Sequence, residues 1–201
     1  MFYDHDSHKD EQMRVLEETV FSSEVLSDAL ERARLLGLEN YYIGAGFVAQ
    51  IVWNSLFGKS LTYGIKDIDL VYFDDVNLDV ESENLVCVRA RELFADFDLE
   101  IDVKNQARVH LWYEKHFGYS IAPYRSLESA IDHWPTTATS IGIRKTGDHE
   151  LKVYAPFGLE DLFAKTVRAN KAQITRDIFA GKVSNWLAKW PELVIVPWDE
   201  E

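Results

Sequence analysis

The chain contains a single cysteine, Cys87, among its 201 residues. One cysteine excludes an intramolecular disulfide and a cysteine-based zinc site, and it is typical of a protein in a reducing cytosol. The surrounding stretch is apolar, so we interpret Cys87 as a small buried side chain. The sequence also lacks any apolar run of the ~20 residues that a membrane span needs, and it does not begin like a signal peptide. We expect a cytoplasmic protein without a membrane segment.

Basic side chains are scarce relative to acidic ones. The chain has 21 Lys and Arg against 34 Asp and Glu, which gives a formal net charge of −13. Generic DNA and RNA binding depends on Lys and Arg that neutralise phosphates, so this balance argues against a non-specific nucleic-acid binder. A nucleotide is still an acceptable ligand for an acidic protein when metal ions supply positive charge locally.

Hydrophobic residues make up 47% of the chain and six residues are tryptophan, as in a globular protein with a full core. Repeats, low-complexity segments and long linkers are missing, so we predict one domain over residues 1–201. Its periodicity predicts an α+β fold, a small mixed sheet with helices against it. The expected parts are N-terminal helices over 1–37, a core over 40–163, and C-terminal helices with a tail over 164–201. The expected elements are strands at 41–43, 66–73 and 99–104, a hairpin of 139–144 with 150–154, helices at 47–57, 84–94, 159–169 and 175–190, and a terminal strand or apolar tail at 194–196.

The stretch from Lys66 to Phe73 is the chemical centre of the sequence. As a strand, it puts Asp67 and Asp69 on one face and the apolar Ile68 on the other. Two like charges on one face repel, and a divalent metal between them would relieve this, because Mg²⁺ is bound by carboxylates together with substrate phosphates. The alternative is a solvated polar face on an edge strand. An Asp-x-Asp pair alone does not separate the two interpretations.

Two further features flank this pair. Gly44-Ala45-Gly46 follows a short strand and precedes a helix, so its backbone can approach a ligand closely, although a tight packing turn explains it equally well. Asp102 lies on a third predicted strand. Two-metal phosphoryl transfer needs carboxylates that hold the ions and backbone donors for the phosphates, and these three features supply both.

These motifs resemble the DNA polymerase β-like nucleotidyltransferase superfamily, whose signature is a small-residue turn, an Asp-x-Asp pair and a later single carboxylate. More narrowly, the chain is similar to bacterial nucleotidyltransferases of the NTP-transferase-6 type. The blocks that carry the resemblance are Lys66–Asp74, Val103–Tyr113, Tyr124–Ser126, His133–Thr139 and Ala155–Phe163. The block that begins at Val103 is the specific one, because an Asp-x-Asp pair is common.

The resemblance implies a polymerase β palm-like core, a small mixed sheet with helices packed on it and helical additions at both ends. It implies an enzyme that transfers a nucleoside monophosphate from an NTP to an acceptor hydroxyl and releases pyrophosphate. Two Mg²⁺ ions are the expected cofactors, with Mn²⁺ as an alternative.

The resemblance also assigns site residues. Catalysis and metal binding fall to Asp67, Asp69 and Asp102, with Asp102 next to the attacking hydroxyl. The expected nucleotide contacts are backbone at Gly44 and Gly46, and side chains of Lys104, Asn105 and Arg108, which we expect to line the cleft. For Lys104 and Arg108 the competing role is to neutralise neighbouring acids.

The chain departs from the superfamily in three respects, one of which is a long separation from Gly46 to Asp67. Ala45-Gly46 stands where Gly-Gly is usual, and Ala49-Gln50 stands where tRNA-tailing members have Arg-Asp, so a tRNA role is not implied. The net charge favours a small-molecule or protein acceptor over a polynucleotide. Most tryptophans are expected in the core, with Trp134 as a candidate for the border of the cleft.

Two alternatives to nucleotidyl transfer remain open. One is a different metal-dependent phosphoryl-transfer or hydrolytic activity on the same three carboxylates. The other is a catalytically silent nucleotide-binding or toxin–antitoxin-type regulatory module on the same fold.

Overall fold

A computed structural model describes residues 5–148 and 150–200. The strands are β1 (Tyr41–Gly44), β2 (Asp67–Tyr72), β3 (Glu100–Asn105), β4 (Gly142–Gly147), β5 (Glu150–Tyr154), β6 (Thr166–Val167) and β7 (Val194–Ile195). The α-helices are α1 (His5–Ser22), α2 (Glu24–Leu35), α3 (Ala45–Leu56), α4 (Val80–Leu93), α5 (Val109–Phe117), α6 (Leu127–Ile131), α7 (Glu160–Phe163) and α8 (Arg176–Leu187), and the short 3-10 helices are η1 (Gln106–Arg108) and η2 (Thr137–Thr139). Within the described ranges, none of these helices combines the length and the apolar character that crossing a membrane requires.

A five-stranded sheet in the order β3-β2-β1-β4-β5 forms the centre of the molecule. Strand β1 pairs antiparallel with β2 and β4, and β5 pairs antiparallel with β4, whereas β2 and β3 are parallel. Parallel neighbours need a crossover connection, and α4 supplies it. The predicted mixed α+β architecture is confirmed.

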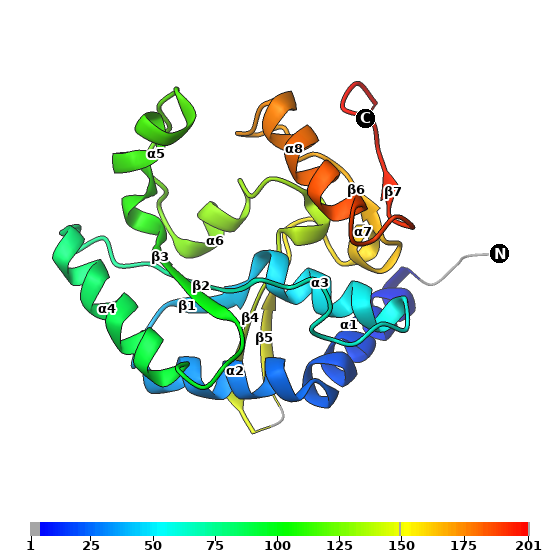
Figure 1. Cartoon of the computed structure of the whole chain (residues 1–201), viewed down its shortest axis with the longest axis horizontal. Helices are drawn as coiled ribbons and strands as arrows, with labels where there is room; N and C mark the ends of the chain where they lie inside the picture. Colours follow the sequence, from blue (N-terminus) through cyan, green and yellow to red (C-terminus); the bar gives the residue numbers. More distant parts are fainter. Residues whose placement is uncertain (1–4, 149, 201) are drawn as a thin grey trace.

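One face of the sheet packs on α1, α2, α3 and α4, the helices nearest that face in Figure 1. Ile68 and Leu70 of β2 belong to the same core as Trp53 of α3, and all three are fully buried. Burial contributes about 1.5–3 kcal/mol for each such aliphatic side chain. Because side chains alternate along a strand, this burial turns Asp67 and Asp69 to the opposite face.

That opposite face is covered only in part. Tyr42 and Val71 of the sheet form a small second core with Leu127 and Ile131, which seats the short helix α6. Helices α5 and α8 lie on the same side of the sheet as α6 and stand apart from each other (Figure 1). The end of β2 that carries the acids is therefore left open to a cleft.

Local interactions and backbone conformation account for both ends of α2. The Ser23 side chain accepts a hydrogen bond from the Leu26 N–H at the start of the helix, as an N-cap does. Gly37 follows the end of the helix with φ 68°, a conformation that glycine adopts without steric cost.

The region after β5 differs from the prediction. A helix over 159–169 is expected, but α7 ends at Phe163, and Lys165 has φ 56°, which turns the chain out of the helix. Thr166–Val167 then form β6 and pair in parallel with Val194–Ile195. The C-terminal tail is thus a strand, β7. Apolar spacing within 159–169 could not reveal this, because the pairing partner lies at the far end of the chain.

Candidate active site

The parallel strands place two acids side by side. Asp69 of β2 and Asp102 of β3 are register partners, and neighbouring strands lie about 4.8 Å apart. Both side chains line one cleft, which we call the carboxylate cleft. Asp67 is exposed at the start of β2, where its register partner is Glu100.

Burial and like charge both act on Asp69. Burial, and then the negative charge of Asp67, raise the pKa of Asp69 from 3.8 to about 7, with a smaller contribution from Asp102. A hydrogen bond that Phe47 N–H donates to Asp69 Oδ2 at 3.2 Å and the positive charge of Lys182 act in the opposite direction. A carboxyl group in this environment favours a proton or a bound cation, which is typical of functional sites.

The turn between β1 and α3 lies against Asp69. Gly44 is required there, because a Cβ atom would stand 2.2 Å from the Ile141 carbonyl oxygen. Ala45 has φ 50°, a left-handed conformation that costs about 1–2 kcal/mol for a residue with a side chain. A Cβ atom on Gly46 would stand 3.6 Å from Asp69 Oδ2, so the turn and the carboxylate are in contact. Strain at such a position is typical of ligand sites.

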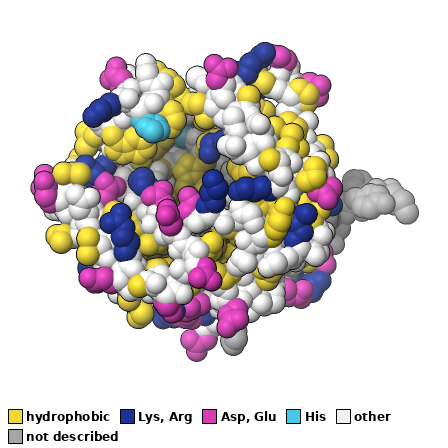
Figure 2. All heavy atoms as spheres, in the orientation of Figure 1, with side chains coloured by type: hydrophobic (Ala, Val, Ile, Leu, Met, Phe, Trp, Pro, Cys, Tyr) yellow, Lys and Arg dark blue, Asp and Glu magenta, His cyan; other side chains and the backbone are white. Residues whose placement is uncertain are grey.

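The carboxylate cleft has a volume of about 390 Å³. Figure 2 shows a hollow between α5 and α8, with acidic and basic side chains along its lower rim. The rings on the walls of the cleft are Trp112, Tyr113, Phe117, Tyr124, His133 and Trp134. Flat rings of this kind stack on nucleobases. Trp134 borders the cleft, as the sequence suggested. Trp112 also lines the cleft, although it was expected in the core. Trp53 and Trp190 are core residues, as expected.

Two lysines lie near the acids of the cleft, Lys104 beside Asp102 on β3 and Lys182 on α8. Lys104 forms an ion pair with Asp102, so an ammonium group occupies the neighbourhood of this carboxylate. Lys182 of α8 lines the cleft and favours the charged form of Asp69. The sequence predicted Lys104 at the cleft but not Lys182, because α8 lies more than 100 positions from β2 and only the fold brings them together.

The other two polar residues predicted to line the cleft have different partners. Arg108 is buried, forms an ion pair with Glu83, and donates from Nε to the Leu78 carbonyl oxygen at 2.8 Å. The Asn105 amide accepts from Asp74 N–H at 3.0 Å and donates to the Asp74 carbonyl at 2.8 Å. Neither residue lines the cleft, contrary to expectation, because both side chains fix the loop after β2. Gln106 lines it instead.

The carboxylates fit a metal bound together with substrate. Among residues 9–148 and 150–200, no three His, Cys, Asp or Glu side chains gather closely enough to hold an ion by themselves. Asp67 lies with Asp102 in a neighbouring groove of about 600 Å³, so Asp102 borders both spaces. Mg²⁺ usually takes one or two carboxylates plus phosphates and waters, and not an all-protein cage. Asp69 and Asp102 can supply the two carboxylates of such a site, and Asp67 borders it from the adjoining groove.

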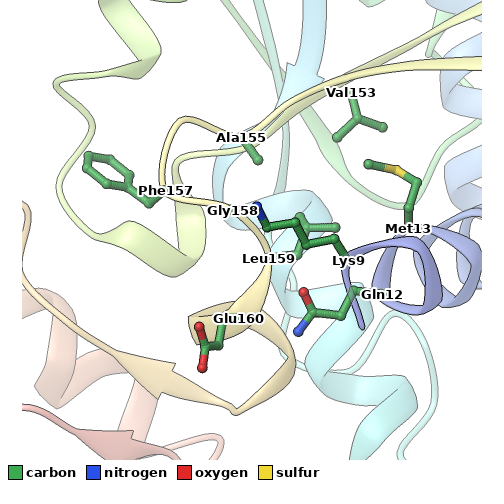
Figure 3. Close-up of a pocket in the computed structure, with 9 residues that line it drawn as sticks. All are labelled: Lys9, Gln12, Met13, Val153, Ala155, Phe157, Gly158, Leu159 and Glu160. Carbon is green, nitrogen blue, oxygen red and sulfur yellow. The ribbon is translucent and has the colours of Figure 1, made fainter. Parts of the chain in front are cut away.

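A further hollow of about 480 Å³ lies elsewhere, between α1 and the segment that follows β5 (Figure 3). Met13, Val153 and Leu159 form its apolar surface, and Lys9 and Glu160 are its charged residues. None of the predicted site residues lines it. The carboxylate cleft is therefore the candidate active site, although it is the smaller of the two spaces.

The fold and the paired acids define a protein of the nucleotidyltransferase class. A family model described as Nucleotidyltransferase matches residues 31–195. The chain therefore belongs to the nucleotidyltransferase family. This covers all five strands of the central sheet, both acids of the cleft and the helix α8.

One solved structure agrees with this assignment. A structure described as revealing a CCA-adding enzyme head domain matches with a TM-score of 0.75 and 27% sequence identity, over 90% of this chain and 94% of that one. A tRNA-processing enzyme in an apo form matches with a TM-score of 0.44 and 15% identity, over 98% of this chain and 45% of that one. A search of curated proteins returned no match.

Proposed function

We propose that this protein transfers a nucleoside monophosphate from an NTP to an acceptor hydroxyl and releases pyrophosphate, with divalent metal ions as cofactors. The observation that carries the proposal is the register of Asp69 with Asp102 at the floor of a cleft with aromatic walls. Family membership supports the reaction class. The proposal adds the donor, the metal and the residues.

In this reaction the acceptor oxygen attacks the α-phosphorus of the NTP. A new P–O bond forms, the bond from the α-phosphorus to the bridging oxygen breaks, and pyrophosphate leaves with the bonding electrons. The acceptor hydroxyl loses its proton, and Asp102 is the carboxylate placed to receive it. Divalent ions bound at Asp67, Asp69 and Asp102 would supply charge neutralisation for the triphosphate.

The other residues of the cleft bind and orient the NTP. Lys104 and Lys182 supply positive charge for the phosphates, and the backbone of the Gly44 to Gly46 turn approaches them from β1. Trp112 and Trp134 provide faces for the base. Each contact acts by positioning and electrostatics, which are the main sources of rate enhancement in phosphoryl transfer.

A nucleotide-binding module without turnover is the second candidate. It is favoured by one observation, the ion pair of Lys104 with Asp102, which gives Asp102 a partner that is not a metal. In such a module the NTP would bind, but no acceptor would be modified. Turnover is supported by the buried Asp69 and the acids beside it, because such crowding lowers stability and is typical of functional sites.

One experiment separates the two. The protein is incubated with each labelled NTP, Mg²⁺ and an extract of small molecules and proteins, and pyrophosphate release and label transfer are measured. We expect both to occur with wild type and to be lost with Asp69→Asn. NTP binding without either product would support the binding module. Failure of every NTP and of Mg²⁺ to bind would contradict the proposed function.

A further inference from the structure

A second hollow adjoins the carboxylate cleft. It has a volume of about 460 Å³ and lies against the segment that joins α5 to α6. Tyr124, His133 and Gln173 line both spaces, so the two share a wall. Nucleotidyl transfer has two substrates, and each space falls within the ~300–1,000 Å³ that is usual for one small ligand.

The charge of the second hollow is opposite to that of the chain. Its lining contains one charged side chain, Arg125, and no carboxylate, although the net charge of the protein is −13. Arg125 is exposed, and its guanidinium has no ion pair or hydrogen bond within the described part of the chain. A free guanidinium binds phosphate or carboxylate through two parallel hydrogen bonds.

The shared wall offers a fixed acceptor and free donors. His133 Nδ1 lies 2.7 Å from the Ser129 carbonyl oxygen, which only accepts, so Nδ1 donates and Nε2 of the neutral ring keeps its lone pair. Tyr124 OH donates to Gln173 Oε1 at 2.8 Å, which orients this amide and leaves its NH₂ group for a ligand. Tyr119 OH donates to the Gln173 carbonyl oxygen at 2.7 Å and holds the same segment in place.

We infer that the second hollow is the acceptor site and that the acceptor is a small hydroxyl compound with a phosphate or carboxylate group. Arg125 and the Gln173 amide bind the anion, and His133 Nε2 accepts a hydrogen bond from a hydroxyl at the shared wall. The acceptor then faces the cleft where Asp102 lies. This inference rests on the proposed function, because an acceptor site needs a donor beside it.

The test uses the full-length ¹⁵N-labelled protein. A non-hydrolysable α,β-methylene analogue of ATP with Mg²⁺ first fills the carboxylate cleft. Inorganic phosphate and acetate are then titrated separately, and amide shifts of residues 119–125 and 173 are recorded. We expect the amide signals of residues 119–125 and of residue 173 to shift. The anion that binds more tightly identifies the acidic group of the acceptor. Arg125→Ala should weaken binding of the anion by about tenfold or more, because a charge-assisted hydrogen bond is lost. Arg125→Lys should lose less than Arg125→Ala.

The control is Arg89→Ala, which removes an equally exposed arginine from α4, outside both hollows. It should leave anion binding unchanged. Analogue binding without any shift in residues 119–125, or equal affinity in Arg125→Ala, would overturn the inference and leave the proposed function standing. Anion shifts in a protein that does not bind the analogue would refute the proposed function, and with it the acceptor role. A short oligoribonucleotide that displaces phosphate at far lower concentration would overturn the small-molecule assignment.

Discussion

Lys104 and Asp102 form an ion pair on the cleft side of β3, two positions apart on the same face of the strand. The ammonium group therefore competes with a metal for Asp102 but also offers a charge to phosphate. We expect Lys104→Met to bind Mg²⁺ alone up to about fivefold more tightly, since an exposed ion pair is worth up to about 1 kcal/mol. The same variant should bind NTP about tenfold more weakly, because a charge-assisted contact is lost.

Calorimetric titrations with Mg²⁺ and with NTP measure the two effects of Lys104→Met. Lys152→Met serves as the matched control, because Lys152 is similarly exposed and pairs with Glu128 away from the cleft. A fall in affinity for both ligands would show that Lys104 does not compete with the metal.

Asp69 lowers the stability of the metal-free protein. Its burial and its acidic neighbours disfavour the carboxylate, so Asp69→Asn should raise the free energy of unfolding by about 1–2 kcal/mol at pH 8 in EDTA. The asparagine oxygen still accepts the hydrogen bond from Phe47. Urea denaturation measures this, and Asp67→Asn should raise the free energy of unfolding by less than Asp69→Asn, because it removes only one of the charges that act on Asp69. Both variants should lack transfer activity, and destabilisation by Asp69→Asn would contradict the electrostatic account.

Gly44 is fixed by the close approach of Ile141. A methyl group placed 2.2 Å from a backbone oxygen forces the β1–α3 turn to move, and overpacking of this kind costs about 1–3 kcal/mol or more. Gly44→Ala should therefore lower the midpoint of thermal unfolding and weaken NTP binding. Gly181→Ala is the control, because no atom lies within 4 Å of its added methyl group in helix α8. Alanine is the better helix former, so this variant should be as stable as wild type or up to about 1 kcal/mol more stable.

Arg108 should be a structural residue. Its side chain is 9% exposed and that of its partner Glu83 is 12% exposed, and loss of one member of a buried pair costs about 3–5 kcal/mol. Arg108→Met should be strongly destabilised in urea denaturation. The double variant Arg108→Met, Glu83→Gln should recover most of the loss, because the glutamine oxygen can still accept from Asn105 N–H. NTP affinity should be close to wild type in the double variant. A tenfold loss of NTP affinity in the double variant would indicate that Arg108 contacts phosphate directly, as predicted from the sequence.

Glu31 links stability to acidic pH. A hydrogen bond from Lys145 holds the pKa of Glu31 below its ordinary 4.5 in the folded protein. Since the folded pKa is the lower one, the pair stabilises the protein above about pH 4.5. That contribution is lost as the pH falls through the folded pKa. Glu31 is 45% exposed, so Glu31→Gln should cost at most about 1 kcal/mol at pH 7. The difference from wild type should vanish toward pH 3.

Urea denaturation at several pH values follows the Glu31 effect. Glu192→Gln, which removes an exposed acid from outside any ion pair of the described residues, should show no such dependence. A gap between wild type and Glu31→Gln that stayed constant from pH 7 to pH 3 would argue against the Lys145 pair as its cause.

Local patterns in the sequence predicted most elements of the sheet and of the helices. Alternation located β2 and β3, and apolar periodicity located the helices before β1. The prediction failed at α7, where the pairing of β6 with β7 decides the structure. Strand pairing between distant segments leaves no periodic pattern in either segment, so periodicity does not predict short parallel pairs.

The sequence by itself determined that the side chains of Asp67 and Asp69 point away from the core on the same face of the strand. Side chains alternate along a strand, and Ile68 and Leu70 occupy the buried face. The sequence also determined that a small-residue turn precedes a helix earlier in the chain. Only the tertiary structure decided which charges surround these acids. The packing of α8 brings Lys182 toward Asp69. Arg108 forms an ion pair with Glu83 and does not line the cleft. The reason is that pairing and electrostatics depend on distances through space, which the chain fixes only when the sheet and the helices have packed.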